Sequence, residues 1–295
     1  MHEHHHHAEV SSKTVGLLFL SFIINMLLSV VEIIGGIISG SVALIGDALH
    51  NTSDAFSILV AVLAFKIGAK RANSKYTYGF RRAEVIGGFI NLILLFISGC
   101  YLAVEGVGRL ISPQQIDGKM IIVISVLALV IDALTAKISH HGAHHNHNMK
   151  MVFVHNLADA FGSLGVIVSG ICVLLWGVYR IDGIIALVIA AYMIWQAIAS
   201  FKPIVNILMN AAPESIDLEE VKKSIAKIKG VKDVHHLHLW CIDEHETALE
   251  CHVISEDMTV AQKIAKKLDE KFAIEHCNVQ VETKEKCCKC SCCDN

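Results

Sequence analysis

Six long apolar stretches constrain this chain more than any other feature of its sequence. A helix needs about 20 mostly apolar residues to cross about 30 Å of hydrocarbon. Of the 295 residues, 54% are hydrophobic and 18% are charged, whereas soluble domains contain roughly 45–50% apolar and about 25% charged residues. The sequence therefore predicts an α-helical membrane protein with six transmembrane helices. These are expected at residues 15–38, 42–65, 84–108, 120–138, 152–178 and 183–207.

The distribution of lysine and arginine predicts the orientation of these spans, because cytoplasmic loops carry an excess of both residues. One side of the predicted membrane domain holds ten of them and the other side holds three. We therefore expect both termini and the loop at 139–150 in the cytoplasm. Residues 1–9 are polar and do not resemble a cleaved signal peptide, so the first span should be retained. A plasma (inner) membrane location is expected, since the short chain shows no targeting extension.

The composition changes sharply at Asn210–Pro213, after which charged residues are dense. Asp217 is an N-cap candidate for a helix, and Thr259 with Gln262 forms a potential capping box for another. The intervening β-rich runs give the order α-β-β-α-β, which predicts a small α+β domain with a ferredoxin-like arrangement. The predicted organisation is a His-rich tail at 1–12, the membrane domain at 13–208, a cytoplasmic metal-binding domain at 213–283 and a Cys-rich tail at 284–295.

Two predicted spans share one polar pattern, a histidine followed four residues later by an aspartate. The second span contains His50 and Asp54, and the fifth contains His155 and Asp159. Residues four apart lie on one face of a helix, so each pair presents an imidazole and a carboxylate together. At a rise of about 1.5 Å per residue, Asp54 and Asp159 lie about 18 Å and 10 Å from opposite membrane faces. The two pairs can therefore meet at a similar depth.

Carboxylates at that depth are energetically unfavourable, because inserting an ionised aspartate near mid-bilayer costs at least about 2.5–3.5 kcal/mol of free energy. Two carboxylates and two imidazoles, however, neutralise and coordinate a divalent cation, and zinc favours such a tetrahedral set. Magnesium and calcium prefer oxygen ligands alone, and copper(I) prefers sulfur. Hydrogen bonding between helices is the alternative, but the repeated pattern favours a zinc site. Its ligands would be His50, Asp54, His155 and Asp159.

Other polar residues interrupt the apolar spans. Asp47 lies one helical turn before His50 and could support a ligand or carry a proton. Asn25, Glu32 and Asp132 occupy the first and fourth spans. For all four residues, functional and structural roles are both open.

These features together resemble the cation diffusion facilitator family, zinc-transporter type. The resemblance rests on six spans, the His-x-x-x-Asp pairs in spans two and five, a His-rich loop and the C-terminal α-β-β-α-β domain. The runs at 40–44, 47–50 and 234–240 are similar to that family as well. The resemblance extends from about residue 13 to residue 282. It implies a homodimeric transporter, not an enzyme, that exchanges a cytoplasmic metal ion for protons by alternating access.

The resemblance also implies metal ligands in the cytoplasmic domain, at His235, His252 and Glu282. For the neighbouring histidines we expect only a solvated face; these are His236, His238 and His245. Some bacterial relatives bind a further metal ion between spans two and three. Residues 73–82 of this chain contain no histidine or aspartate, so we expect none there.

Further potential ligands lie on the predicted cytoplasmic side. The histidines of the loop before span five could bind zinc loosely and raise its concentration at the entrance, although a polar linker is the alternative. They are His140, His141, His144, His145 and His147. A similar tract opens the chain. Five cysteines in the last nine residues suit soft-metal binding better than a disulfide framework.

Several functions remain open at this point. Cobalt, nickel or cadmium efflux would use the same ligands, because affinities at such sites follow a general order. A non-transporting metal sensor or buffer would use the His and Cys tracts, but it needs no ligands inside the bilayer. An intramembrane zinc protease would require His-Glu-x-x-His on one helix within the membrane, and none of the six predicted spans contains this motif. The net charge of -3, without a basic stripe, argues against nucleic acid. The expected partners are a divalent metal ion, protons, membrane lipid and a second copy of the chain.

Overall fold

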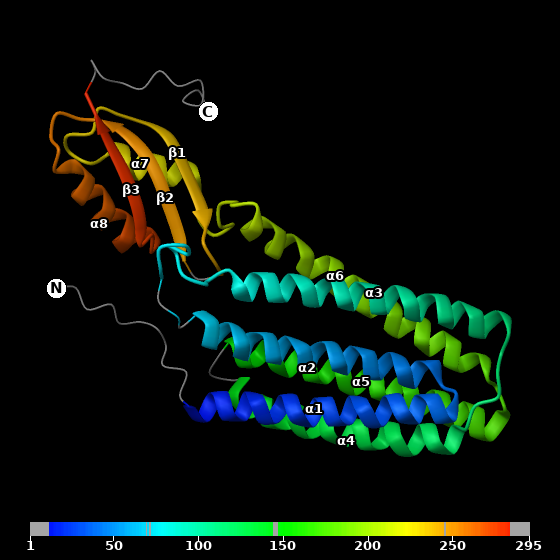
Figure 1. The fold of residues 1–295 in the computed structure, drawn as a ribbon. Helices are drawn as coiled ribbons and strands as arrows, with labels where there is room; N and C mark the ends of the chain where they lie inside the picture. The colour runs from blue at the N-terminus through cyan, green and yellow to red at the C-terminus, as the bar shows by residue number, and fades with distance from the viewer. Residues whose placement is uncertain (1–11, 69, 71, 144–146, 245, 284–295) are drawn as a thin grey trace. The chain divides into compact units, whose positions relative to one another are not determined.

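The computed structural model describes residues 12–68, 70, 72–143, 147–244 and 246–283, and Figure 1 shows the helices and strands that they form. The chain divides into two compact units, Met1–Phe65 with Ile90–Ser200 and Lys66–Phe89 with Phe201–Asn295. The predicted domain boundaries stay predictions. The long helices are α1 (Ser12–Ser39), α2 (Val42–Gly68), α3 (Ala83–Ile111), α4 (Gly118–Ala143), α5 (His147–Trp176) and α6 (Arg180–Leu208).

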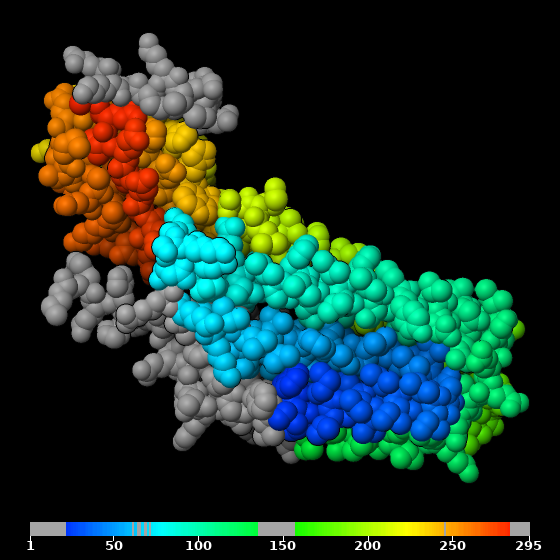
Figure 2. Space-filling model, in the orientation of Figure 1, coloured from blue at the N-terminus to red at the C-terminus, as the bar shows by residue number. Residues whose placement is uncertain are grey.

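The helical part of the chain has the character of a membrane domain. Within the described residues, four helices have segments long and apolar enough to cross a bilayer, and they belong to α1, α3, α5 and α6. Many of their outward side chains are large and apolar: Val104 and Ile111 are each 74% exposed. So much exposed apolar surface suits lipid and not water, and Figure 2 shows α1 and α3 at the surface of this unit. The chain is therefore an integral membrane protein, while spans at α2 and α4 remain part of the prediction.

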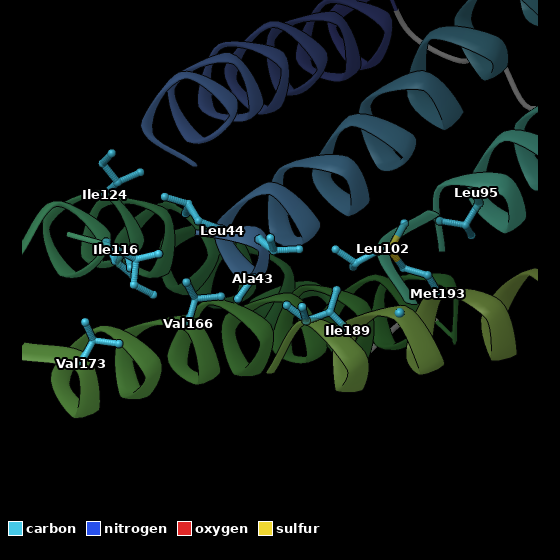
Figure 3. Close-up of a cluster of buried hydrophobic side chains, with 14 of the residues drawn as sticks. Ala43, Leu44, Leu95, Leu102, Ile116, Ile124, Val166, Val173, Ile189 and Met193 are labelled. Atoms are coloured by element: carbon cyan, nitrogen blue, oxygen red, sulfur yellow. The ribbon is translucent and has the colours of Figure 1, made fainter. Parts of the chain in front are cut away.

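Aliphatic side chains and close helix contacts hold the helical unit together. Figure 3 shows Leu44, Leu102, Val166 and Met193 among a cluster of buried side chains to which α2, α3, α4, α5 and α6 all contribute. Glycines bring some backbones unusually close: a Cβ added to Gly183 of α6 would lie 2.8 Å from a carbonyl oxygen of α3. Small residues at such contacts let helices pack tightly without a hydrophobic driving force from water.

The start of α2 is fixed by a carboxylate that lies far away in the sequence. Asp182, at the beginning of α6, is 1% exposed. Its Oδ2 atom accepts hydrogen bonds from the backbone N–H groups of Val42 at 2.7 Å and Ala43 at 3.4 Å. Its Oδ1 atom accepts one from the hydroxyl of Ser41. A negative charge is favourable at a helix N-terminus, where the first N–H groups have no partner within the helix. This contact sets the position of the helix that carries His50 and Asp54.

The C-terminal part forms a three-stranded sheet with helices α7 and α8. The elements follow in the order α7 (Leu218–Ala226), β1 (Asp233–Cys241), β2 (Thr247–Ile254), α8 (Val260–Phe272) and β3 (His276–Glu282). The sheet order is β1-β2-β3, with β1 antiparallel to β2 and β2 parallel to β3. Buried side chains of both helices pack against one face of the sheet, among them Ile225, Ile264 and Leu268. The predicted order α-β-β-α-β is present, and the ferredoxin-like arrangement stays a prediction.

The two predicted helix caps have different outcomes. Asp217 caps α7 as expected, because its side chain accepts a hydrogen bond from the N–H of Glu219. The capping box at Thr259 is wrong, since the Thr259 side chain makes no cap hydrogen bond to α8. Its hydroxyl instead donates to the carboxylate of Asp257 at 2.6 Å. Hydrogen bonds from Lys263 and Thr259 lower the pKa of Asp257 to about 2, so this carboxylate is ionised at neutral pH.

The segment between α2 and α3 contacts the β1–β2 turn within the second unit. The Arg81 guanidinium pairs with the Glu246 carboxylate and lies 3.8 Å from that of Asp243. Arg82 donates from Nε to the carbonyl oxygen of Ile242 at 3.3 Å and from its guanidinium to the side chain of Asn210. Two adjacent arginines therefore attach the start of α3 to this turn.

Candidate metal sites

Three of the four predicted membrane ligands meet between α2 and α5. Nε2 of His50 lies 3.1 Å from Oδ1 of Asp159 and 3.4 Å from Oδ2 of Asp54. His50 and Asp159 are buried, with exposures of 4% and 8%. One ligand atom from each residue lies within 4.8 Å of the others. A single imidazole nitrogen that faces two carboxylates is a geometry in which a divalent cation can replace the proton between them.

The fourth predicted ligand is placed only by its backbone. His155 lies in α5, one helical turn before Asp159, and its side chain lies outside the described part of the structure. The spacing of four residues puts the two on the same face of the helix. His155 as a ligand therefore stays a prediction.

A layer of buried polar side chains surrounds this site. Nδ2 of Asn51 donates to Oε2 of Glu32 at 2.9 Å and so joins α2 to α1. The hydroxyl of Ser163 on α5 lies 2.9 Å from Oδ2 of Asp47 and 3.0 Å from Oδ2 of Asp132. The hydroxyl has one proton and can donate to only one of these carboxylates at a time. Three of the polar residues left open by the sequence, Glu32, Asp47 and Asp132, thus each lie within hydrogen-bonding distance of a side chain on a neighbouring helix.

Sequence reasoning missed two further groups near the site. The ring of Tyr192 on α6 meets the His50 imidazole edge to face, with 5.5 Å between centroids. On α3, Asn91 donates to the hydroxyl of Ser57 at 2.7 Å and accepts from that of Ser53 at 3.4 Å. Neither residue is part of a local motif, so only the polarity of Asn91 within an apolar span could have drawn attention to it.

The three residues implied for the cytoplasmic domain lie together on its sheet. Nδ1 of His252 lies 3.0 Å from Oε1 of Glu282, and Nε2 of His235 lies 3.4 Å from Oε2 of the same carboxylate. Burial lowers the pKa of His252, while the Glu282 charge acts in the opposite direction. A neutral imidazole next to a buried carboxylate is what metal coordination requires. The three residues can therefore hold a metal ion.

His236 does not lie on a merely solvated face, in contrast to our expectation. It forms a second group of potential ligands with Glu250 and His252, again with ligand atoms within 4.8 Å. His238 is exposed, and its ring centroid lies 4.5 Å from that of His236.

Matches to family models decide what kind of protein this is. Residues 18–209 match the cation efflux transmembrane domain, and residues 213–284 match the cytoplasmic domain of cation efflux proteins. The chain belongs to the cation diffusion facilitator family. The resemblance seen in the sequence is thereby confirmed, and the family is one of transporters and not a class of enzymes.

Known members of the cation diffusion facilitator family are similar over most of the chain. A cadmium, cobalt and zinc/H(+)-K(+) antiporter of Bacillus subtilis is 32% identical over 95% of this chain and 92% of its own length. The metal cation efflux system protein CzcD of Cupriavidus metallidurans is 31% identical, with 86% and 82% covered. The zinc transporter ZitB of Escherichia coli is 30% identical, with 85% and 82% covered. The solved metal-bound C-terminal domain of the Cupriavidus CzcD transporter matches at 35% identity and a TM-score of 0.22, covering 23% of this chain and 99% of that domain.

Peripheral ligands expected for this family member lie largely beyond the described residues. The backbones of His140, His141 and His147 belong to the ends of α4 and α5, but their side chains lie outside the description. His144, His145 and His245 lie outside it entirely, as do the His-rich and Cys-rich tails. Metal binding by the loop histidines and by the two tails stays a prediction, and so does the solvated face expected at His245.

Proposed function

We propose that this cation diffusion facilitator is a zinc/proton antiporter, which exports or compartmentalises cytoplasmic zinc through a tetrahedral site. The ligands would be His50 and Asp54 of α2 with His155 and Asp159 of α5. The observation that supports this most directly is that Nε2 of His50 faces carboxylate oxygens of both helices, at 3.1 and 3.4 Å. Among the relatives named above, the Escherichia coli protein is named a zinc transporter and the Bacillus subtilis protein a cadmium, cobalt and zinc/H(+)-K(+) antiporter.

The chemistry of the ligands explains why metal and protons would exchange. Zinc binds neutral imidazole and ionised carboxylate, so its binding displaces protons from the same groups, and protonation releases it. Two carboxylates balance the charge of the ion, which makes a buried divalent cation tolerable in a region of low dielectric. A proton gradient across the membrane can therefore drive metal out of the cytoplasm if the site opens to the two sides in turn.

Several properties belong to the same proposal. The protein would act as a homodimer, consistent with the match of its C-terminal region to the family's cytoplasmic domain. Six helices would span the plasma (inner) membrane, with both termini in the cytoplasm. Cadmium and cobalt remain candidate substrates besides zinc, because the Bacillus relative is named for all three metals and sites of nitrogen and oxygen ligands discriminate poorly among them.

Flux measurements in proteoliposomes test the proposal. Purified protein is reconstituted with a fluorescent zinc indicator inside the vesicles, and zinc entry is driven by an outward proton gradient. Asp54→Ala and Asp159→Ala should each lower the flux more than about 100-fold, since loss of a direct ligand should exceed the 10–100-fold effects of outer-shell changes. Asp117→Ala serves as a matched control, because Asp117 is an exposed aspartate at the start of α4.

Near wild-type flux in either site variant would contradict the proposed ligands. Flux that is absent from the wild-type protein would favour a metal sensor or buffer instead. Repeating the assay with cadmium and cobalt at equal concentration separates the candidate substrates.

A further inference from the structure

The sheet of the cytoplasmic domain has one face packed by helices and one face rich in metal-ligating side chains. Leu249, Cys251 and Val253 of β2 point into the hydrophobic core formed with α7 and α8. Side chains alternate along a strand, so Glu250 and His252 lie on the other face. On β3, Glu282 pairs with Ile254 in a parallel register and lies on this face as well. We call this the histidine face.

An irregularity in β1 adds one more histidine to this face. Val234 and Leu239 are both buried in the core, yet they are five residues apart, and a regular strand would point them to opposite sides. The register shifts between His235, which pairs with His252, and His238, which pairs with Glu250. The extra residue of this bulge lets His235 and His236 both lie on the histidine face.

The conformation of His236 is the second observation. Its φ of 50° lies in the left-handed region, which a residue with a side chain adopts at an energetic cost. Its ring centroid lies 4.6 Å from that of His252, and its buried Nδ1 atom has no hydrogen-bond partner among the described residues. Bulges often re-aim a side chain toward a functional site. A left-handed backbone and a buried imidazole nitrogen that no described residue satisfies are both typical of a side chain that is held in place to bind a ligand.

We propose that His236, Glu250 and His252 bind a second divalent metal ion, of the zinc class, next to the ion expected at His235, His252 and Glu282. His252 would be common to both sites, because an imidazole has two nitrogens on opposite edges of its ring. Its Nδ1 atom faces Oε1 of Glu282 at 3.0 Å without the alignment of a hydrogen bond. Nε2 is then the atom that serves the second ion, and the ring loses its remaining proton when that ion binds.

The ligand types fit such an ion. Each set supplies two imidazole nitrogens and one carboxylate oxygen, which suits zinc and leaves a fourth position for water. The carboxylates of Glu250 and Glu282, with the deprotonated ring of His252, offset three of the four positive charges of two ions. This site lies outside the membrane ligands, so the inference does not depend on the proposed transport function.

Zinc stoichiometry of the full chain tests the proposal. The protein is purified in detergent and dialysed against zinc held by a chelator at a free concentration that fills the wild-type sites. Bound zinc per chain is then measured by mass spectrometry of the metal. His236→Asn retains a residue that tolerates the left-handed conformation, and Glu250→Gln retains the shape of the side chain. Each variant should bind one zinc ion fewer per chain than the wild type.

His252→Ala should bind two ions fewer, and His235→Ala one fewer. His238→Ala is the matched control, because it removes a histidine of the same strand from outside both ligand sets, and it should bind as the wild type does. Zinc held elsewhere in the chain is equal in all variants, so only differences count. Unchanged stoichiometry in His236→Asn or Glu250→Gln, or the loss of a single ion in His252→Ala, would overturn the proposal. Asp54 and Asp159 are intact in every variant, so zinc bound at the membrane site does not change the differences in bound zinc between variants. Failure of the transport proposal would show only in the vesicle flux.

Discussion

Removing the carboxylate of Asp182 should destabilise the helical unit more than any other single cap in the described part of the chain. Asp182→Ala removes a charged acceptor from the N–H of Val42 and from the hydroxyl of Ser41, and both donors are buried. A hydrogen bond to a charged group contributes about 1.5–3 kcal/mol, and a buried donor left without a partner costs about 1–3 kcal/mol. Allowing for relaxation, we expect a loss of about 3–5 kcal/mol in the free energy of unfolding.

Two comparison variants isolate the cause of this effect. Asp182→Asn keeps one acceptor oxygen and the volume of the side chain, so it should cost only about 1–2 kcal/mol. Asp117→Ala removes a cap of the same residue type from α4, where Asp117 accepts from Lys119 N–H at 3.0 Å and Met120 N–H at 3.2 Å in an exposed position. Water can replace this carboxylate, so the loss should be about 1 kcal/mol.

The free energies can be measured by titrating the purified protein with sodium dodecyl sulfate in mixed micelles, followed by circular dichroism. The free energy of unfolding should be lowest for Asp182→Ala, intermediate for Asp182→Asn and highest for the wild type. If Asp182→Ala were no more destabilising than Asp117→Ala, the reasoning from burial would be refuted, and the contact between α6 and α2 would have to be regarded as incidental.

Three further predictions concern the loop contact, the buried thiols and the membrane histidine. Arg81→Ala should increase amide hydrogen exchange at the β1–β2 turn, because it removes the ion pair with Glu246, whereas unchanged exchange would mean that the pair does not hold the turn. Burial raises the pKa of Cys251 to about 12 and that of Cys277 to about 11. Both thiols should therefore resist iodoacetamide at pH 8 in the folded protein and react after unfolding, as peptide mass spectrometry can show. The stability that the two neutral buried thiols contribute is present below pH 9 and is lost as the pH rises toward 12. His50→Asp should shift the ratio of manganese to zinc flux upward, because oxygen replaces a nitrogen that favours zinc, and an unchanged ratio would remove His50 from selectivity.

Local patterns in the sequence were sufficient for much of the fold. Apolar stretches of span length predict the long helices, and the four-residue spacing of His50 and Asp54 places both side chains on one helix face without any knowledge of the rest of the chain. The cap at Asp217 is likewise a matter of neighbouring residues, because its side chain reaches an N–H two positions away. Such features depend on backbone geometry within one or two turns, which the sequence fixes directly.

Contacts between distant segments were decided only by the tertiary structure. His50 meets Asp159 across 109 positions, and Asp182 caps α2 from 140 positions away. Neither distance follows from periodicity, because the packing of apolar faces selects which helices become neighbours. The Thr259 capping box was a local motif, but Thr259 has helical dihedrals, φ −77° and ψ −6°, instead of the extended conformation typical of an N-cap residue, and its hydroxyl bonds to Asp257.

His236 shows the same division between sequence and structure in the cytoplasmic domain. Strict alternation along β1 would have separated His235 from His236, one on each face of the sheet. Burial of both Val234 and Leu239 in one core requires an extra residue between them, and the resulting bulge moves His236 next to His252. The sequence determined that this strand is rich in histidine. Only the packing of its apolar residues decided which histidines share a face, because the free energy gained by burying those residues exceeds the strain of the bulge.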